Sequence, residues 1–241
     1  MYNEELLKDV ERRNENGDVV VKSSGGKVTK IIKCVCTFLA LFLLYEFAQV
    51  ISVLSLAIKE PVFQTLLGGV AILVAIWLFI WIFKKLSWIE LDLKSIDIKK
   101  CVIYLIGGNL LNFCGLFVAQ LFMGEQIPEN QELVIEMGKN MAIVLFFMQI
   151  VIFAPIVEEY IFRGYLQSMA LKNYPKIGFL VTALLFTLVH GPNNIGSFIE
   201  YGTLATILGI ICYRTKRIEY AICFHIFNNL IGFIQIFNEI S

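Results

Sequence analysis

The chain has 241 residues, of which 58% are hydrophobic, and its 20 basic and 20 acidic side chains leave no net charge. A mean hydropathy of +0.74 excludes an ordinary soluble domain and indicates an integral membrane protein. The absence of net charge argues against a nucleic-acid partner. The six cysteines fall mostly in apolar segments and form no CxxC pair, which argues against a disulfide framework and against a thiolate zinc site.

The first 30 residues are polar and mixed in charge, and the first apolar run begins near Ile31. A cleavable signal peptide would instead place an apolar segment directly after a short basic one. We therefore expect residues 1–30 to form a flexible cytoplasmic tail and residues 31–241 to form a single transmembrane domain.

Apolar segments then follow one another along the chain, and most reach the roughly 20 residues that a helix needs to cross a bilayer. The expected fold is all-α, a polytopic transmembrane helical bundle of about seven spans. The fifth span is short, and we expect its helix to start earlier, near Asn173. The expected spans are Ile31–Ile58, Val62–Phe83, Cys101–Phe122, Met141–Phe162, Ile177–Val189, Ser197–Tyr213 and Ile218–Phe237.

Lysine and arginine are concentrated at alternate ends of these spans. They are frequent in the tail and in the second, fourth and sixth connections, whereas the other connections hold only Lys59 and Lys139. By the positive-inside rule, the N-terminus lies in the cytoplasm and, after seven spans, the C-terminus lies outside. The expected location is the cell membrane, with membrane lipids around the bundle.

Two connections have a pattern of their own. Residues 88–98 alternate apolar and charged side chains, which predicts an extended or amphipathic segment along the cytoplasmic surface. Residues 128–139 predict a short amphipathic helix on the other side, with Pro128 near its start.

Two adjacent carboxylates, Glu158 and Glu159, end a long apolar run. A carboxylate near the centre of a membrane helix costs about 2.5–3.5 kcal/mol, so the pair needs water, a partner or a proton. Arg163 lies four residues after Glu159, where on a helix the two side chains meet with the acid N-terminal to the base. Glu158 points about 100° away from Glu159, so we expect Glu158 to remain free for chemistry.

The chain contains two histidines, and each lies in a span that follows the glutamates. Phe186 precedes His190 by four residues, so on a helix the two rings can pack together. Asn229 follows His225 by four residues, so both face the same way.

Depth can be compared from the helical rise of about 1.5 Å per residue. Glu158 stands 14 residues before Lys172, and His190 stands 14 residues after Lys176. The two groups are therefore expected at similar depth, in one cavity with His225 and Asn229. We expect this cavity to face the cytoplasm.

Two chemistries suit such a group. A carboxylate beside an imidazole in a partly dry pocket can deprotonate water, and a second imidazole with an amide donor can stabilise an oxyanion. Together they would hydrolyse a peptide bond with no cofactor. The alternative is a metal, because Glu158, His190 and His225 match a catalytic zinc ligand set. Against the metal, there is no HExxH motif, and the three ligands come from separate helices.

Each feature also has a purely structural interpretation. An intramembrane histidine often only bonds a neighbouring helix, and paired glutamates near an arginine are commonly a solvated helix end. The concentration of these groups in four consecutive spans favours a site. Six further polar residues are expected to form inter-helix contacts or cavity lining: Glu46, Gln49, Asn109, Asn112, Gln149 and Glu200.

The ordered motifs resemble those of a known family. Residues 158–163 read Glu-Glu-x-x-x-Arg, residues 186–190 read Phe-x-x-x-His, and residues 225–229 read His-x-x-x-Asn. These resemble the three motifs of the CPBP intramembrane proteases, which include the type II CAAX prenyl endopeptidases and bacterial Abi proteins. The resemblance covers about residues 141–237, whereas the first three spans share only their hydrophobicity.

The resemblance implies an intramembrane endopeptidase in which Glu158 and His190 activate water while His225 and Asn229 hold the oxyanion. Glu159 and Arg163 would support the site. The implied substrate is a membrane-associated peptide or a prenylated or otherwise lipid-linked protein. The composition favours the roles of bacterial relatives, which are peptide maturation, bacteriocin immunity and surface-protein regulation.

Two other functions remain open from the sequence. One is a non-catalytic membrane partner that regulates a sensor kinase, a transporter or a toxin receptor. The other is a proton-coupled transporter, which is expected to show paired repeats or broken helices. The sequence shows neither of these transporter features.

Overall fold

The computed structural model describes residues 11–13, 19–21, 25–89, 91–123 and 127–240. The chain divides into two compact units, residues 1–40 and residues 41–241. Most of the expected flexible tail therefore lies outside the described residues, and its flexibility stays a prediction.

The first unit contains a strand pair that the sequence analysis did not predict. Strand β1 (Glu11–Arg13) pairs antiparallel with β2 (Val19–Val21), so that Arg12 lies opposite Val20. The three consecutive valines of β2 are β-branched, which favours the extended backbone. The helix α1 (Gly25–Leu54) begins in this unit and continues into the second.

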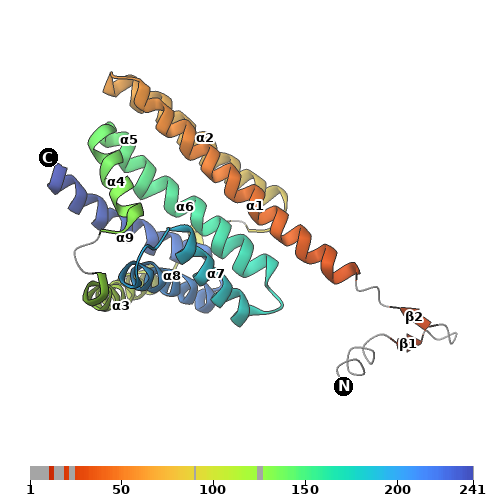
Figure 1. The fold of residues 1–241 in the computed structure, drawn as a ribbon. Helices are drawn as coiled ribbons and strands as arrows, with labels where there is room; N and C mark the ends of the chain where they lie inside the picture. The colour runs from red at the N-terminus through yellow and green to blue at the C-terminus, as the bar shows by residue number, and fades with distance from the viewer. Residues whose placement is uncertain (1–10, 14–18, 22–24, 90, 124–126, 241) are drawn as a thin grey trace. The chain divides into compact units, whose positions relative to one another are not determined.

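Helices make up the second unit (Figure 1). After α1 come a 3₁₀ turn, η1 (Ser55–Ala57), the helix α2 (Pro61–Lys85) and a second 3₁₀ turn, η2 (Leu93–Ser95). The following helices are α3 (Ile98–Met123), α4 (Glu129–Asn140), α5 (Ile143–Phe147), α6 (Ala154–Glu159), α7 (Pro175–Val189), α8 (Ile195–Thr215) and α9 (Ile218–Ile240).

The expected spans agree with these helices. Within the part of the chain that the structure describes, six helical segments are long and apolar enough to cross a membrane, and α7 is a shorter apolar helix. The expected all-α transmembrane bundle of about seven spans is thus confirmed. Large apolar side chains remain exposed on the outer spans, including Leu66 at 58%, Ile103 at 65% and Leu121 at 68%. An apolar surface of this extent suits lipid and not water.

The fourth span has an unusual backbone. It runs without interruption from Ile143 to Ala170, but the segments η3 (Met148–Phe153) and η4 (Tyr160–Ala170) are π-helical and flank the short α6. Pro155 lies in the first turn of α6, where its missing N–H removes a hydrogen bond from the regular ladder. π-Helical turns often occur at functional sites, and here they border the two glutamates.

Helices α3 and α8 approach each other closely because small residues lie between them. A side chain at Gly115 would collide with Thr203, and one at Gly196 would meet the Ala119 carbonyl oxygen at 2.7 Å. Small residues at such positions let helix backbones pack tightly in a membrane. This packing fixes α8 as one wall of the cavity described below.

The two connections with a predicted pattern also have a defined structure. Helix α4 begins directly after Pro128, as predicted. The connection after α2 is held to the start of α9, because Arg217 Nη1 donates to the Ser95 carbonyl oxygen at 2.9 Å and the Asp92 amide donates to Glu219 Oε1 at 2.9 Å. Hydrogen bonds from Ser95 lower the pKa of the exposed Asp92 carboxyl below its usual value.

Candidate active site

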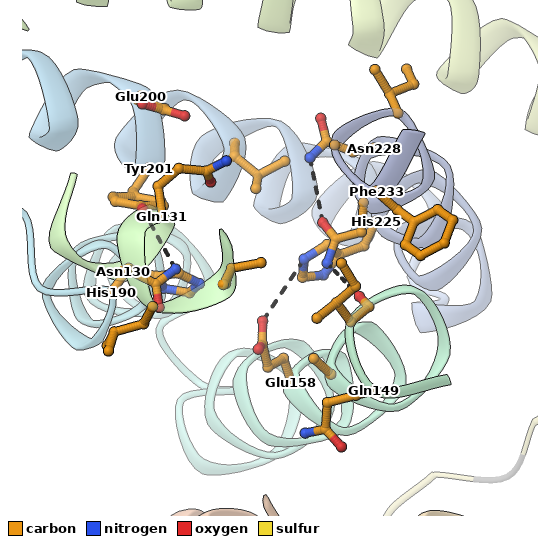
Figure 2. Close-up of a pocket in the computed structure, with 18 of the residues that line it drawn as sticks. Asn130, Gln131, Gln149, Glu158, His190, Glu200, Tyr201, His225, Asn228 and Phe233 are labelled. Carbon is orange, nitrogen blue, oxygen red and sulfur yellow. Dashed lines mark hydrogen bonds and ion pairs between the residues drawn. The ribbon is translucent and has the colours of Figure 1, made fainter. Parts of the chain in front are cut away.

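A cavity of about 740 Å³ lies among α1, α3, α4, α8, α9 and the fourth span. Four of the predicted site residues line it, namely Glu158, His190, His225 and Asn229. The six additional polar residues named from the sequence line it as well. Figure 2 shows Glu158, His190 and His225 projecting from three separate segments toward the same space.

Glu158 has its two carboxylate oxygens in different environments. The Tyr45 hydroxyl, from α1, donates to Oε1 at 2.8 Å. The other oxygen, Oε2, makes no hydrogen bond with any residue that the structure describes, although Glu158 is only 8% exposed. Oε2 lies 3.8 Å from His225 Nε2. Glu158 is therefore held through one oxygen and presents the other to the cavity.

Glu159 lies behind the cavity wall and is fully buried. Its Oε1 accepts from Arg163 Nη1 at 2.9 Å, which is the pair predicted from the helical spacing. Arg163 is also fully buried, and its Nη2 donates to the Ala205 carbonyl oxygen at 3.0 Å. Its guanidinium carbon lies 4.4 Å from the centre of the Phe186 ring. The pair is therefore fixed by the fourth span, α7 and α8 together.

His225 lies between the two glutamates and is 2% exposed. Its Nδ1 is 3.0 Å from Glu159 Oε1, and a carboxylate paired with an arginine accepts hydrogen bonds and does not donate them. The proton of this contact therefore belongs to Nδ1, which turns Nε2 toward Glu158 and the cavity. Glu159 orients His225 as a third group orients the base in a catalytic triad.

His190 caps the end of α7, one residue beyond the helix in which it was expected. Its Nδ1 lies 2.7 Å from the Phe186 carbonyl oxygen, which can only accept, so Nδ1 again carries the proton. The ring packs between Phe186 and Tyr201, with ring centres 4.4 and 4.9 Å away. Both histidines thus have Nδ1 occupied and Nε2 available for chemistry.

Asn229 is placed by the backbone of the fourth span. Its Nδ2 donates to the Ile150 carbonyl oxygen at 2.9 Å, which leaves one N–H of the amide for another acceptor. On the same wall, Asn112 donates to Asn228 Oδ1 at 2.8 Å. The amide predicted to stabilise an oxyanion is therefore at the cavity, held by a bond to the helix that carries Glu158.

The metal alternative requires Glu158, His190 and His225 to converge on one point. No group of three His, Cys, Asp or Glu side chains among the described residues could hold a metal ion as they are placed. The predicted ligand set, Glu158, His190 and His225, therefore does not fit a metal ion in this arrangement.

The cavity lies at the end of the bundle away from the basic connections. It is lined by α4, by the last residues of α7 and by the first half of α8, whereas Lys94, Lys172 and Arg217 lie at the opposite helix ends. A cytoplasm-facing cavity therefore disagrees with the orientation that the positive-inside rule predicts. The residue counts from Lys172 and Lys176 gave the depth of Glu158 and His190 below the basic connections. They could not show that α4 lies against the opposite end of the bundle.

Tyr45 is the site residue that sequence reasoning missed. It is buried in α1 and separated from Glu158 by 113 residues. A tyrosine in an apolar helix has no periodic or motif signal that distinguishes it from core packing. Only its neighbour Glu46, a charged residue in a span, indicated that this face of α1 meets something polar.

The part of the chain that carries the three motifs is similar to known proteins. Residues 140–231 match the family model described as type II CAAX prenyl endopeptidase Rce1-like. The chain is 27% identical over 153 residues to the UPF0177 protein YvdC of Lactococcus lactis subsp. lactis (strain IL1403), covering 64% of this chain and 56% of that protein. No solved structure matches.

A second relative has a functional name. The chain is 26% identical over 163 residues to the membrane-embedded CAAX protease MroQ of Staphylococcus aureus (strain USA300), covering 61% of this chain and 64% of that protein. The chain thus spans less than two thirds of the length of each relative. These similarities support the family resemblance inferred from the three motifs. The residues matched by the family model include Glu158, Glu159, His190, His225 and Asn229.

Proposed function

We propose that this chain is an intramembrane endopeptidase of the CPBP family and that it uses glutamate-activated water. The match to the Rce1-like family model and the similarity to MroQ support the family. The observation that carries the proposal is that the two carboxylate oxygens of Glu158 have different environments. Tyr45 holds one oxygen. The other is buried at a cavity shared with two histidines and has no hydrogen-bond partner among the described residues. Such an oxygen can accept a proton from a bound water.

The proposed reaction has no covalent intermediate. A water in the cavity is held by Glu158 Oε2 and by His190 Nε2, and it loses a proton to Glu158 as its oxygen attacks the carbonyl carbon of the scissile bond. The tetrahedral oxyanion accepts hydrogen bonds from the free N–H of Asn229 and from His225 Nε2 when that nitrogen is protonated. The C–N bond then breaks, and Glu158 returns the proton to the leaving nitrogen.

Glu159 and Arg163 are proposed as positioning residues and not as reacting groups. They lie outside the cavity lining, and Glu159 holds the Nδ1 side of His225. Removal of one donor to an oxyanion typically costs about 3–4 kcal/mol in the transition state. Misplacement of His225 by loss of Glu159 should therefore reduce the rate without changing which bond is cut.

The proposed substrate is a membrane-associated peptide or a lipid-linked protein that enters from the membrane side opposite the basic connections. In the predicted orientation that side is extracytoplasmic. We propose a role in peptide maturation, bacteriocin immunity or surface-protein regulation. The name of the MroQ relative, a membrane-embedded CAAX protease, supports the class of enzyme.

The proposal is tested with purified protein in lipid nanodiscs and a set of internally quenched peptides. The variants Glu158→Ala, His190→Ala and His225→Ala should each lose cleavage while keeping the wild-type unfolding temperature. Glu132→Ala, on the exposed face of α4, is the matched control and should cleave normally. Wild-type cleavage in any of the three variants would refute the proposed site.

A second arm separates the two mechanisms. A glutamate enzyme should keep its activity after prolonged treatment with a metal chelator. Loss of activity that added zinc restores would instead support the metal alternative.

A further inference from the structure

The described lining of the cavity holds carboxylates but no permanently positive side chain. Among the described residues that line it are three glutamates and nine carboxamide side chains, but no lysine or arginine. Glu158 belongs to the proposed chemistry, whereas Glu46 from α1 and Glu200 from α8 have no part in it. These two carboxylates lie in membrane spans, where a charge without a partner is unfavourable.

Neither Glu46 nor Glu200 makes a hydrogen bond or an ion pair with any other residue that the structure describes. Both are only partly buried and line the cavity from different helices. An ionisable group in a span usually faces a partner or a functional path. The cost of these two residues therefore points to a partner that is brought by the ligand.

Unmet hydrogen-bonding capacity in the buried lining points the same way. Gln149 is 1% exposed and Glu158 is 8% exposed, and in the described part of the chain each has one buried oxygen without a hydrogen bond. Figure 2 shows the Glu158 carboxylate directed into the cavity. Both unpaired atoms are acceptors, so the lining calls for a ligand that is rich in donors. Lysine ammonium and arginine guanidinium groups carry three and five N–H donors with no acceptor.

We propose that the cavity selects a peptide segment that carries a lysine or arginine side chain, with Glu46 and Glu200 neutralising its charge. The carboxamides are suited to the polar backbone of the same segment, because each amide both donates and accepts. This inference rests on the proposed function, since it names the substrate class of that site. Under this inference, the enzyme distinguishes substrates by the positive charge of a lysine or arginine side chain and not only by their attachment to the membrane.

The test measures binding separately from cleavage. The full chain is placed in nanodiscs of zwitterionic phosphatidylcholine, and three fluorescent twelve-residue peptides differ only at two central positions, which are Lys-Lys, Gln-Gln or Glu-Glu. Fluorescence anisotropy should give a Kd about tenfold lower for the lysine peptide than for the glutamine peptide. The glutamate peptide should bind most weakly, and the preference should shrink as salt is raised.

Two double variants test whether Glu46 and Glu200 cause the preference for the lysine peptide. The double variant Glu46→Gln/Glu200→Gln should bind the lysine and glutamine peptides equally. The double variant Glu132→Gln/Glu136→Gln removes the same two charges from the exposed face of α4 and should keep the tenfold preference. If the first double variant does not fold, the two single variants should each reduce the preference.

Three results would overturn the inference: equal wild-type binding of all three peptides, no binding of any, or a preference that survives in Glu46→Gln/Glu200→Gln. The proposed function fails on a different result. If the lysine peptide binds selectively but no peptide is cut, the inference stands and the protease assignment falls. If lysine and glutamine peptides are cut at equal rates, the protease stands and the inference falls.

Discussion

The hydrogen bond from Tyr45 to Glu158 provides a sharp test of how the site works. The Tyr45→Phe variant removes one hydroxyl from a buried ring and leaves its packing against Phe153, 5.6 Å away between ring centres, unchanged. A hydrogen bond to a charged group is worth about 1.5–3 kcal/mol, which corresponds to a rate change of about 10- to 150-fold. We expect kcat to fall by that factor while KM changes less than twofold.

The assay is cleavage of a quenched peptide in nanodiscs, with the unfolding temperature measured in parallel. Tyr220→Phe is the matched control, because Tyr220 is also buried and its hydroxyl accepts from the Asp97 amide at 2.9 Å, outside the cavity lining. Its kcat should stay at the wild-type value. If Tyr45→Phe keeps the wild-type kcat, or loses activity only in proportion to unfolded protein, the reasoning that Tyr45 positions Glu158 is refuted.

Three further predictions follow from packing, charge and orientation. Gly115→Leu should destabilise the fold by about 1–3 kcal/mol, because the new side chain collides with Thr203. The control Gly107→Leu, whose Cβ would meet nothing within 4 Å, should leave the unfolding temperature unchanged. Equal effects of the two substitutions on the unfolding temperature would contradict the packing argument. Arg163→Met should lower the free energy of unfolding by about 3–5 kcal/mol, because it leaves the buried Glu159 carboxylate without its ion-pair partner. The double variant Arg163→Met/Glu159→Gln should be more stable than Arg163→Met in thermal unfolding. Additive losses of stability would refute the coupling between the two residues. In a cysteine-free background, an impermeant maleimide added to intact cells should label Asn193→Cys but not Lys94→Cys, both exposed positions, and the reverse pattern would place the cavity on the cytoplasmic side.

Much of the fold could be predicted because a bilayer imposes simple rules. Span length and apolar composition predicted most helix ends to within four residues, and Pro128 marked the start of α4. The exceptions are α1, which begins six residues before the expected span, and the fourth span, which ends eight residues after the expected end. The spacing from Glu159 to Arg163 predicted their ion pair, because one helical turn separates them. The antiparallel strands near the N-terminus were missed, since three-residue elements leave almost no periodic signal.

The site was only partly predictable, and the reason is tertiary. Local spacing indicated that Glu158 is free and that Phe186 packs on His190, but it could not reveal that His225 bonds Glu159 as well as facing Glu158. The contribution of Tyr45 depends on α1 lying against the fourth span. The end of the bundle at which the cavity lies depends on α4, which no arithmetic along one helix can place.

The most direct test of the central claim is the single-turnover cleavage rate of Glu158→Gln, an isosteric change that removes the proposed base. Loss of a general base typically costs about 10²–10⁴ in rate. We therefore predict a fall of at least about 100-fold in a variant that unfolds at the wild-type temperature and still binds the lysine peptide. Cleavage by this folded variant at the wild-type rate would contradict the account.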